Sequence, residues 1–500
     1  MANSKKVSKG LSYKTKSRVI LGVVIALLIL IVGGYFTYYT GLPARIIPAV
    51  KIVQTVDGKE KTIGRIYTPE LNYYRNQILS MYSQYGLTPS QEYLDAINEP
   101  TGKTNGQLLY DQAAEQIVSV RLVNDIAAKD PNFYSGSSRY AEYQLYLFEL
   151  RADNNSFPTV GQYLAANFGS GMTPSMFAKI VRDENIVQEY QEFLKQTEFL
   201  PTEEEVRAVY EQNPDLYIHT DFNWYYFNKD TFSDPEASAY RVKKAAEDSA
   251  TFNGAILEEM GPELAEIIGF DPNTNSTLVQ GIAKSDVANN GYPEAMNEYI
   301  FNPENVGKAE MFKSENGCYV ALPISVHTAD DTVYSYRKIV LNNVDIDDND
   351  YTEEELIAGI EKTEKKANEL IANVKTEEDF IKLCKDKTES YDDITTGGYT
   401  SGVYAFDFEG EAVSNNDQKL AEWLLDPARK YGDMFVMRSY SNRMVYIYFF
   451  DETMESWEYE ITNQLVNEKA NNWALTSVPT ETTVPQISYE VAEKLSYYAS

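Results

Sequence analysis

Few side chains of this 500-residue chain have the types and spacing that catalysis or metal binding requires. It contains two histidines, His219 and His327, and two cysteines, Cys318 and Cys384. Zinc sites usually draw ligands a few positions apart in the sequence, and these four residues show no such spacing. Two cysteines are too few for a disulfide framework, so we interpret them as small buried residues, although they could pair. The sequence therefore predicts no metal site and no cofactor.

Two further motifs are incomplete. The acidic segment 345–350 resembles a calcium loop, but it lacks the glycine required at the sixth position, and Glu355 falls one place early for the twelfth. We interpret this segment as a solvated turn before a helix. The segment 398–402 resembles a nucleophile elbow, but Ser401 is one place off. A phosphate loop of the G-x-x-x-x-G-K type is absent from the sequence.

The first 40 residues have the pattern of a membrane anchor. Residues 1–18 carry lysine and arginine but no acidic residue, and residues 19–36 are largely apolar. Such a run is about long enough to span a bilayer, and basic residues stay on the cytoplasmic side. We expect a cytoplasmic head (1–18), a single transmembrane helix (19–39) in the lipid bilayer, and an extracytoplasmic body. A cleaved signal peptide is the alternative, but its apolar core is usually about 7–15 residues long.

Composition limits the functions of the body. The formal net charge of −31 argues against nucleic-acid binding, which needs a basic surface. The chain is 43% hydrophobic and 13% aromatic, so it can build real cores. Its length suggests about three domains.

Residues 50–215 have a mostly helical pattern. Thr68 and Pro69 predict a helix start, with Thr68 as N-cap, and Gly86 predicts its end. Apolar residues at helical spacing continue the stripe of this helix to Tyr85. A capping box beginning at Thr202 predicts a further short helix.

Beyond residue 215 a strand, helices and returning strands occur twice, which predicts two α+β modules at 221–327 and 334–452. An amphipathic helix at 453–475 should pack on the helical domain, and a polar tail, 476–500, ends the chain. The expected fold class is multidomain α+β: a transmembrane helix, a helical domain, two modules with antiparallel sheets, and a final amphipathic helix.

Several segments carry a resemblance to a known family. The helix 376–385 followed by Gly397 and Gly398, the strand 334–341 and the strand 443–448 resemble parvulin-type prolyl isomerase domains. Segments 66–74 and 201–206 are similar to the amino-terminal chaperone domain of SurA- and PrsA-like foldases. The resemblance implies a helical domain that cradles unfolded or nascent secreted polypeptides, and modules that isomerise X-Pro bonds.

The family usually places one histidine on the first strand of a parvulin domain and one on the last. At these positions the second copy has Lys338 and Tyr446. The first copy has Asn223 or Trp224 on the first strand, and Tyr319 on the last. We expect both histidines of the chain to lie outside the central strands, and at least one copy to be inactive as an isomerase.

The resemblance also implies substrate-binding residues. Met296 and Phe301 would form the floor of a proline pocket in the first copy, and Trp423 would do so in the second, with Tyr319 and Tyr446 lining a groove. The alternative is that all of them are ordinary core residues. The sequence thus predicts a membrane-anchored extracytoplasmic foldase of unspecified oligomeric state. An inactive envelope scaffold with the same fold is the alternative.

Overall fold

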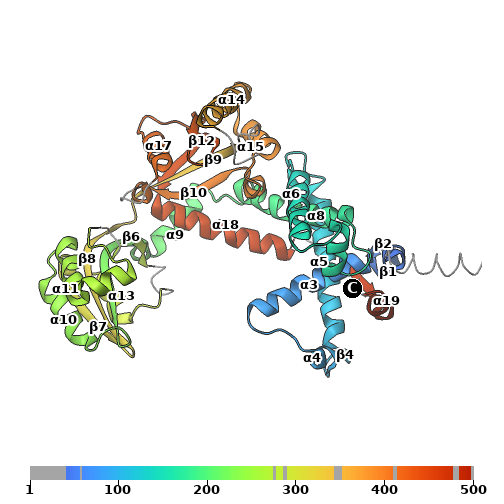
Figure 1. The fold of residues 1–500 in the computed structure, drawn as a ribbon, viewed down its shortest axis with the longest axis horizontal. Coiled ribbons are helices and arrows are strands. Elements are labelled where there is room, and N and C mark those ends of the chain that lie inside the picture. Colours follow the sequence, from blue (N-terminus) through green and yellow to red (C-terminus); the bar gives the residue numbers. More distant parts are fainter. Residues whose placement is uncertain are drawn as a thin grey trace, which may run out of the picture. The chain divides into compact units, whose positions relative to one another are not determined.

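The computed structural model describes residues 41–56, 59–273, 277–284, 290–342, 352–408, 414–476 and 483–496. The chain forms two compact units: residues up to Tyr190 with those from Trp473 onward, and Gln191–Asn472 between them. Both units combine helices with antiparallel strands (Figure 1). We expected the helical domain to extend to residue 215, whereas the first unit ends at Tyr190, inside a helix.

The first unit is mainly helical. Its helices are α2 (Leu42–Ile46), α3 (Thr68–Gln84), α4 (Gln91–Asp95), α5 (Asn105–Ala127), α6 (Ser137–Asn154), α7 (Val160–Phe168), α8 (Pro174–Gln196, shared with the second unit) and α19 (Tyr489–Leu495). Its strands are β1 (Pro48–Val56), β2 (Lys59–Tyr67), β3 (Ile97–Asn98), β4 (Lys103–Thr104) and β13 (Thr483–Ile487).

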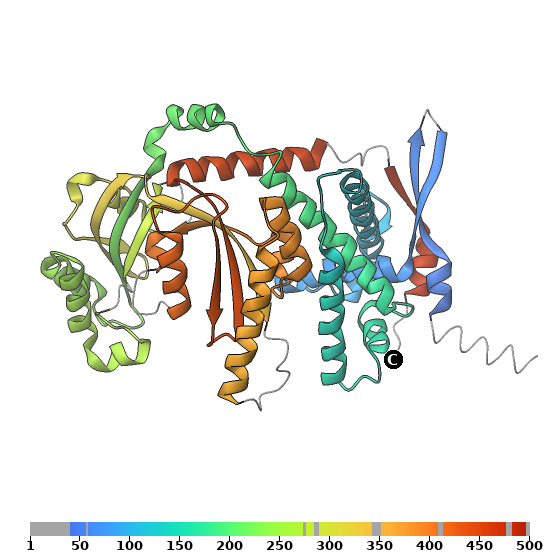
Figure 2. The same ribbon diagram turned by 90° about the horizontal axis from the view of Figure 1, so that it is seen from above.

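The two ends of the described chain meet in one small sheet with the order β13-β1-β2. Figure 2 shows the C-terminal strand beside the N-terminal ribbon, and Val484 pairs with Val53. Ala492 of α19 is buried in the core of the same unit. The predicted polar tail, 476–500, therefore contains a strand and a helix that complete the first unit.

Helix α3 begins and ends close to the predicted positions, but its cap differs. Tyr67, not Thr68, is the N-cap residue, and its side chain makes no capping hydrogen bond. The predicted apolar stripe is buried only in its first half, at Leu71 and Tyr74. Tyr85, at the end of the stripe, is 77% exposed.

The second unit contains two modules. The first has β5 (Ile218–Asn228), α10 (Pro235–Ala245), α11 (Ser249–Ile268), β6 (Leu278–Ala283), α13 (Glu294–Ile300), β7 (Glu310–Ser314) and β8 (Gly317–Thr328). The second has β9 (Thr332–Asn342), α14 (Glu353–Ile371), α15 (Glu377–Lys387), α16 (Asp392–Thr396), β10 (Tyr399–Tyr404), α17 (Asn415–Leu424), β11 (Met434–Ser439) and β12 (Met444–Glu455). Helices α9 (Glu203–Gln212) and α18 (Ser456–Thr476) flank them in sequence.

Both modules have the same antiparallel sheet topology. The strand orders are β6-β5-β8-β7 and β10-β9-β12-β11, so the first and last strands of each module lie in the centre. Each sheet packs one face on its long helices and the other on the short helix α13 or α17. At Gly398 a Cβ atom would lie 2.2 Å from the carbonyl oxygen of Lys338, so only glycine fits at this position.

Helix α18 packs mainly within the second unit, and its last residues, from Trp473, belong to the first. Ile461 is fully buried in a cluster with Val206 of α9 and with Tyr217. Its first residues are bound to the link between the modules, because the Ser456 amide donates to the Asp331 carbonyl at 2.9 Å. This helix was expected to pack on the helical domain, 50–215; α9, which it contacts, lies in that range but in the second unit.

The expected fold class requires a correction. Within the described residues, no helix has the length and apolar character needed to cross a membrane. The transmembrane helix that the expected fold class included is therefore not found among the described residues. The predicted segment 19–39 and the basic head 1–18 lie outside the described residues, as does the acidic segment 345–350.

Candidate functional site

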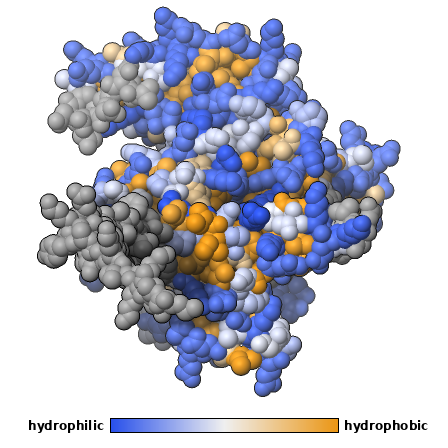
Figure 3. Space-filling view, turned by 90° about the vertical axis from the view of Figure 1, so that its right-hand side faces the viewer, coloured by the Kyte–Doolittle hydropathy of each residue, from blue (hydrophilic) through white to orange (hydrophobic). Residues whose placement is uncertain are grey.

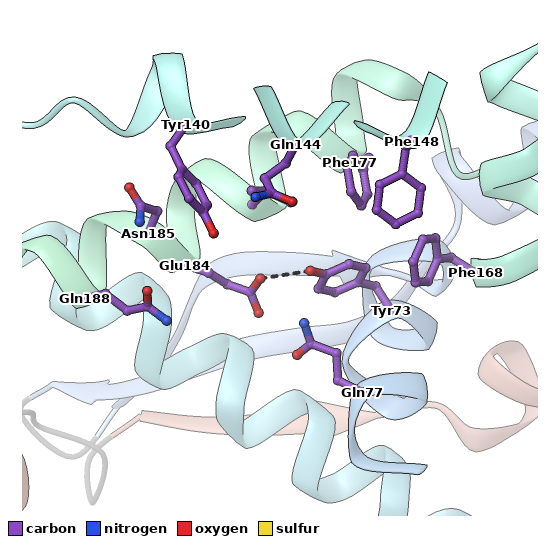
Figure 4. A pocket seen from close by; sticks show the side chains of 11 residues that line it. Tyr73, Gln77, Tyr140, Gln144, Phe148, Phe168, Phe177, Glu184, Asn185 and Gln188 are labelled. Atoms are coloured by element: carbon purple, nitrogen blue, oxygen red, sulfur yellow. Dashed lines mark hydrogen bonds between the residues drawn. The ribbon is translucent and has the colours of Figure 1, made fainter. Parts of the chain in front are cut away.

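Four helices of the first unit surround a pocket of about 300 Å³ (Figure 4). Its residues recur at helical spacing, so each helix turns one face toward the cavity. Helix α3 contributes Tyr73 and Gln77; α6 contributes Tyr140, Gln144 and Phe148; α7 contributes Phe168; and α8 contributes Phe177, Val181, Glu184, Asn185 and Gln188.

One side of the pocket is aromatic. The ring centroids of Phe148 and Phe177 are 4.5 Å apart, and Phe168 lies 5.9 Å from both. Tyr73 joins this cluster at 5.0 Å from Phe168. Such clusters provide a rigid apolar surface for a ligand side chain at little cost in conformational entropy.

The other side is polar and carries one acid. Figure 4 shows Glu184 pointing toward Tyr73, with the amide of Gln77 nearby. The Tyr73 hydroxyl donates to Oε2 of Glu184 at 3.0 Å. Burial raises the pKa of Glu184 to about 7, although hydrogen bonds from Tyr73 and Gln77 oppose the shift. The carboxyl group therefore keeps its proton to higher pH than an ordinary glutamate, and its protonated form both donates and accepts hydrogen bonds.

The pocket combines what an extended peptide needs. Aromatic rings accept apolar side chains, and Gln, Asn and Glu side chains hydrogen-bond to backbone N–H and C=O groups. Its lining residues were not predicted from the sequence. The signal was present as glutamine and aromatic residues four apart on α3 and α6, but such a pattern also occurs on ordinary half-exposed helices.

The candidate residues of the first module lie together. Met296 and Phe301 are 0% and 7% exposed and belong to one cluster, against which Tyr319 and Trp224 pack. Rings of Trp224 and Tyr319 stack with centroids 6.0 Å apart. Met296 and Phe301 are thus buried, and their part in a proline pocket stays a prediction.

The structure also shows which of Asn223 and Trp224, the two candidates on the first strand of the first module, is equivalent to Lys338. Asn223 is buried on the opposite face of the sheet, where its amide donates to Thr277 Oγ1 at 2.8 Å. Trp224 occupies the position equivalent to Lys338, because the amides of both residues donate to the residue just before the neighbouring strand, Thr277 or Gly398.

The candidates of the second module lie on the equivalent face. Trp423 is 7% exposed, in a cluster that Tyr446 packs against. Lys338 is paired in register with Tyr448. Lys338 Nζ is 3.7 Å from the Asp393 carboxylate. Burial raises the pKa of Asp393, and the charge of Lys338 opposes this shift.

The histidines lie elsewhere than expected. His219 is on β5 and His327 is on β8, and the two face each other directly in the ladder. The prediction that they lie outside the central strands was wrong, because both strands extend further than their apolar patterns suggested. Cys318 and Cys384 are both buried and are not joined to each other by a disulfide.

The fold and site together define a two-unit α+β protein with a duplicated four-stranded module and an amphipathic pocket in its helical unit. No protein-family profile matches the chain, and no curated protein sequence matches it.

Proposed function

We propose that this chain is a chaperone-like foldase that binds unfolded polypeptides in extended form through the pocket of its helical unit. The observation that carries the proposal is the arrangement of an aromatic wall opposite a wall of amide and carboxyl groups. The volume of about 300 Å³ suits one or two side chains of a longer peptide.

A second feature of the same unit supports this proposal. Five large apolar side chains between the end of α3 and β3 are 50–77% exposed: Met81, Tyr85, Leu87, Tyr93 and Ile97. Exposed apolar groups in number indicate contact with a partner. On the face shown in Figure 3, apolar residues likewise form patches within a mainly hydrophilic surface.

The second unit supports a foldase of the SurA and PrsA kind. Its two modules repeat one strand order, with the first and last strands side by side, and the family resemblance rests on these strands. The resemblance assigns Lys338 and Tyr446 of the second copy to the positions where the family has histidines. Isomerase activity and the extracytoplasmic location therefore remain predictions.

The proposal is tested with the full chain and a client whose refolding is limited by proline isomerisation. We expect aggregation of the client to be suppressed at about one-to-one amounts. Phe148→Ala should weaken the suppression several-fold, because it removes the centre of the aromatic wall. Glu184→Gln should retain it, because an amide donates and accepts hydrogen bonds as the protonated acid does.

Tyr146→Ala provides a matched control. Tyr146 lies on α6 two residues from Phe148, is 52% exposed and does not line the pocket. Equal loss in both variants would contradict a role for the pocket. Suppression absent from the unaltered chain would refute the chaperone function, and faster refolding at substoichiometric amounts would show that a module isomerises X-Pro bonds.

A further inference from the structure

Both histidines of the chain converge on one aspartate at the end of the first module. The rings of His219 and His327 have centroids 6.1 Å apart. Asp331 follows β8 in the link to β9, and its Oδ2 lies 3.4 Å from His219 Nδ1 and 3.1 Å from His327 Nε2. One carboxylate oxygen therefore faces two ring nitrogens from different strands.

The ring nitrogen of His219 that faces away from Asp331, here called its outer nitrogen, contacts a second carboxylate. Its Nε2 lies 2.8 Å from Oε1 of Glu460 on α18. Both carboxylates accept hydrogen bonds, so the ring N–H can face either of them. With a metal ion on the inner nitrogen, Nδ1, the ring proton would lie on Nε2, where Glu460 accepts it.

The same pattern holds for His327. The Ser325 hydroxyl donates to Oδ2 of Asp221 at 2.8 Å, so its oxygen is left to accept from His327 Nδ1, 3.3 Å away. With a metal ion on the inner nitrogen, Nε2, the ring proton of His327 would therefore lie on Nδ1, where the Ser325 oxygen accepts it.

Without a metal ion, a ring N–H that faces Asp331 makes a hydrogen bond at these distances; a cation among the three atoms would replace that proton. Two imidazole nitrogens and one carboxylate oxygen suit zinc and related transition metals, whereas calcium and magnesium prefer oxygen ligands. Tetrahedral zinc with bonds of about 2.0–2.1 Å sets its ligand atoms about 3.3 Å apart. The distances from Asp331 to the two histidines already match this value, and all three ligand atoms lie within 4.8 Å of one another.

We propose that His219, His327 and Asp331 bind a zinc-class divalent cation, with a fourth coordination position open to water. The His219 side chain is fully buried, while those of His327 and Asp331 are 30% and 35% exposed, so the cation enters from their side. Glu460 orients the His219 ring, as carboxylates commonly do for metal-bound histidines. The cation thereby connects both central strands of the first module, the link to the second module, and α18.

The test uses the full chain, stripped with a chelator and titrated with zinc chloride in a calorimeter at pH 7. We expect one zinc ion per chain. His327→Ala and Asp331→Asn should each weaken binding by at least about 100-fold, and Glu460→Gln by about 10–100-fold. Asp330→Asn is the matched control, since it removes the same charge from an exposed neighbour and should leave the affinity unchanged.

The unaltered chain gives an independent measurement, because it contains only two imidazole groups. Zinc should shift the NMR signals of both rings, with one proton on each outer nitrogen. Rings that are doubly protonated at pH 7 and insensitive to zinc would overturn the proposal. So would calcium binding as tight as zinc binding, or an affinity that His327→Ala and Asp331→Asn leave unchanged.

Discussion

The two modules of the second unit carry different side chains at equivalent positions of their sheets. In the first module Trp224 pairs with Ala321, and in the second module Lys338 pairs with Tyr448. The sheet order is nevertheless the same. The comparison shows that the fold depends on the apolar faces of the sheet, whereas the residue at this central position is free to change from an aromatic to a charged side chain.

Hydrogen bonds lower the pKa of carboxyl groups in both modules, as at Glu355 of the second, but the modules differ in their buried acids. In the first module, hydrogen bonds lower the pKa of Asp248, through the Thr251 amide, and of Glu259, through Arg241. In the second module, burial raises the pKa of Asp393 and raises that of Asp451 to about 7. The second module therefore holds acids that destabilise it when they ionise, which links its stability to pH.

The largest expected effect on stability comes from truncating a large core side chain in one module at a time. Trp423→Ala should destabilise the second module by about 3–5 kcal/mol, because it leaves a cavity between α17 and the sheet. Hydrogen exchange should accelerate at amides of β9 and β12 and remain slow in β5 and β8. Met296→Ala should produce the opposite pattern at a cost of about 2–5 kcal/mol.

Lys419→Ala is the control for this experiment, because Lys419 lies on α17 but is exposed. Its exchange rates should equal those of the unaltered chain. If Trp423→Ala changed the stability by less than about 1 kcal/mol, Trp423 would be a ligand-facing residue and not part of the core.

The next largest effect tests how the stability of the second module depends on pH. Asp451 has a pKa of about 7 when folded, against a usual value of 3.8, so its contribution favours the folded state below about pH 4 and is lost as the pH rises through 7. Asp451→Asn should therefore stabilise the chain at pH 8 by about 1–3 kcal/mol, with a smaller gain at pH 5. Denaturant unfolding at both pH values measures the difference.

Glu422→Gln removes an exposed acid from the same module and should leave the pH dependence unchanged. A gain for Asp451→Asn of equal size at pH 5 and pH 8 would contradict the assignment, because a change that does not depend on pH cannot arise from titration of this group.

Local structure was largely predictable from the sequence. The capping box at Thr202 predicted a helix start, which reciprocal hydrogen bonds confirm. The same local pattern begins the helices after Thr352 and Thr376, and Asp234 is the N-cap of α10. These features depend on residues within one helical turn, so the sequence contains all the information that they need.

Long-range structure was not predictable in the same way. The pairing of Val53 with Val484 joins residues from opposite ends of the chain, and a short polar strand gives no local signal for it. The convergence of His219 and His327 also depends on strand register, which places two distant residues opposite each other. The pocket depends on how α3, α6, α7 and α8 pack, which their separate patterns do not specify.

The smallest expected effect concerns the first-strand position that Lys338 occupies in the second module and Trp224 occupies in the first. A double-mutant cycle with Lys338→Met and Asp393→Asn should give a coupling of about 0.5–1 kcal/mol, because the Lys338 side chain is 33% exposed and its ion pair spans 3.7 Å. The equivalent cycle in the first module, Trp224→Leu with Tyr319→Leu, should give about 0.5–1.5 kcal/mol from ring stacking. Raising the salt concentration to 1 M should reduce the first coupling and leave the second unchanged, since salt screens charges but not stacked rings. Two couplings with the same salt dependence would mean that Lys338 acts through its aliphatic stem, and that the two modules use this position in the same way.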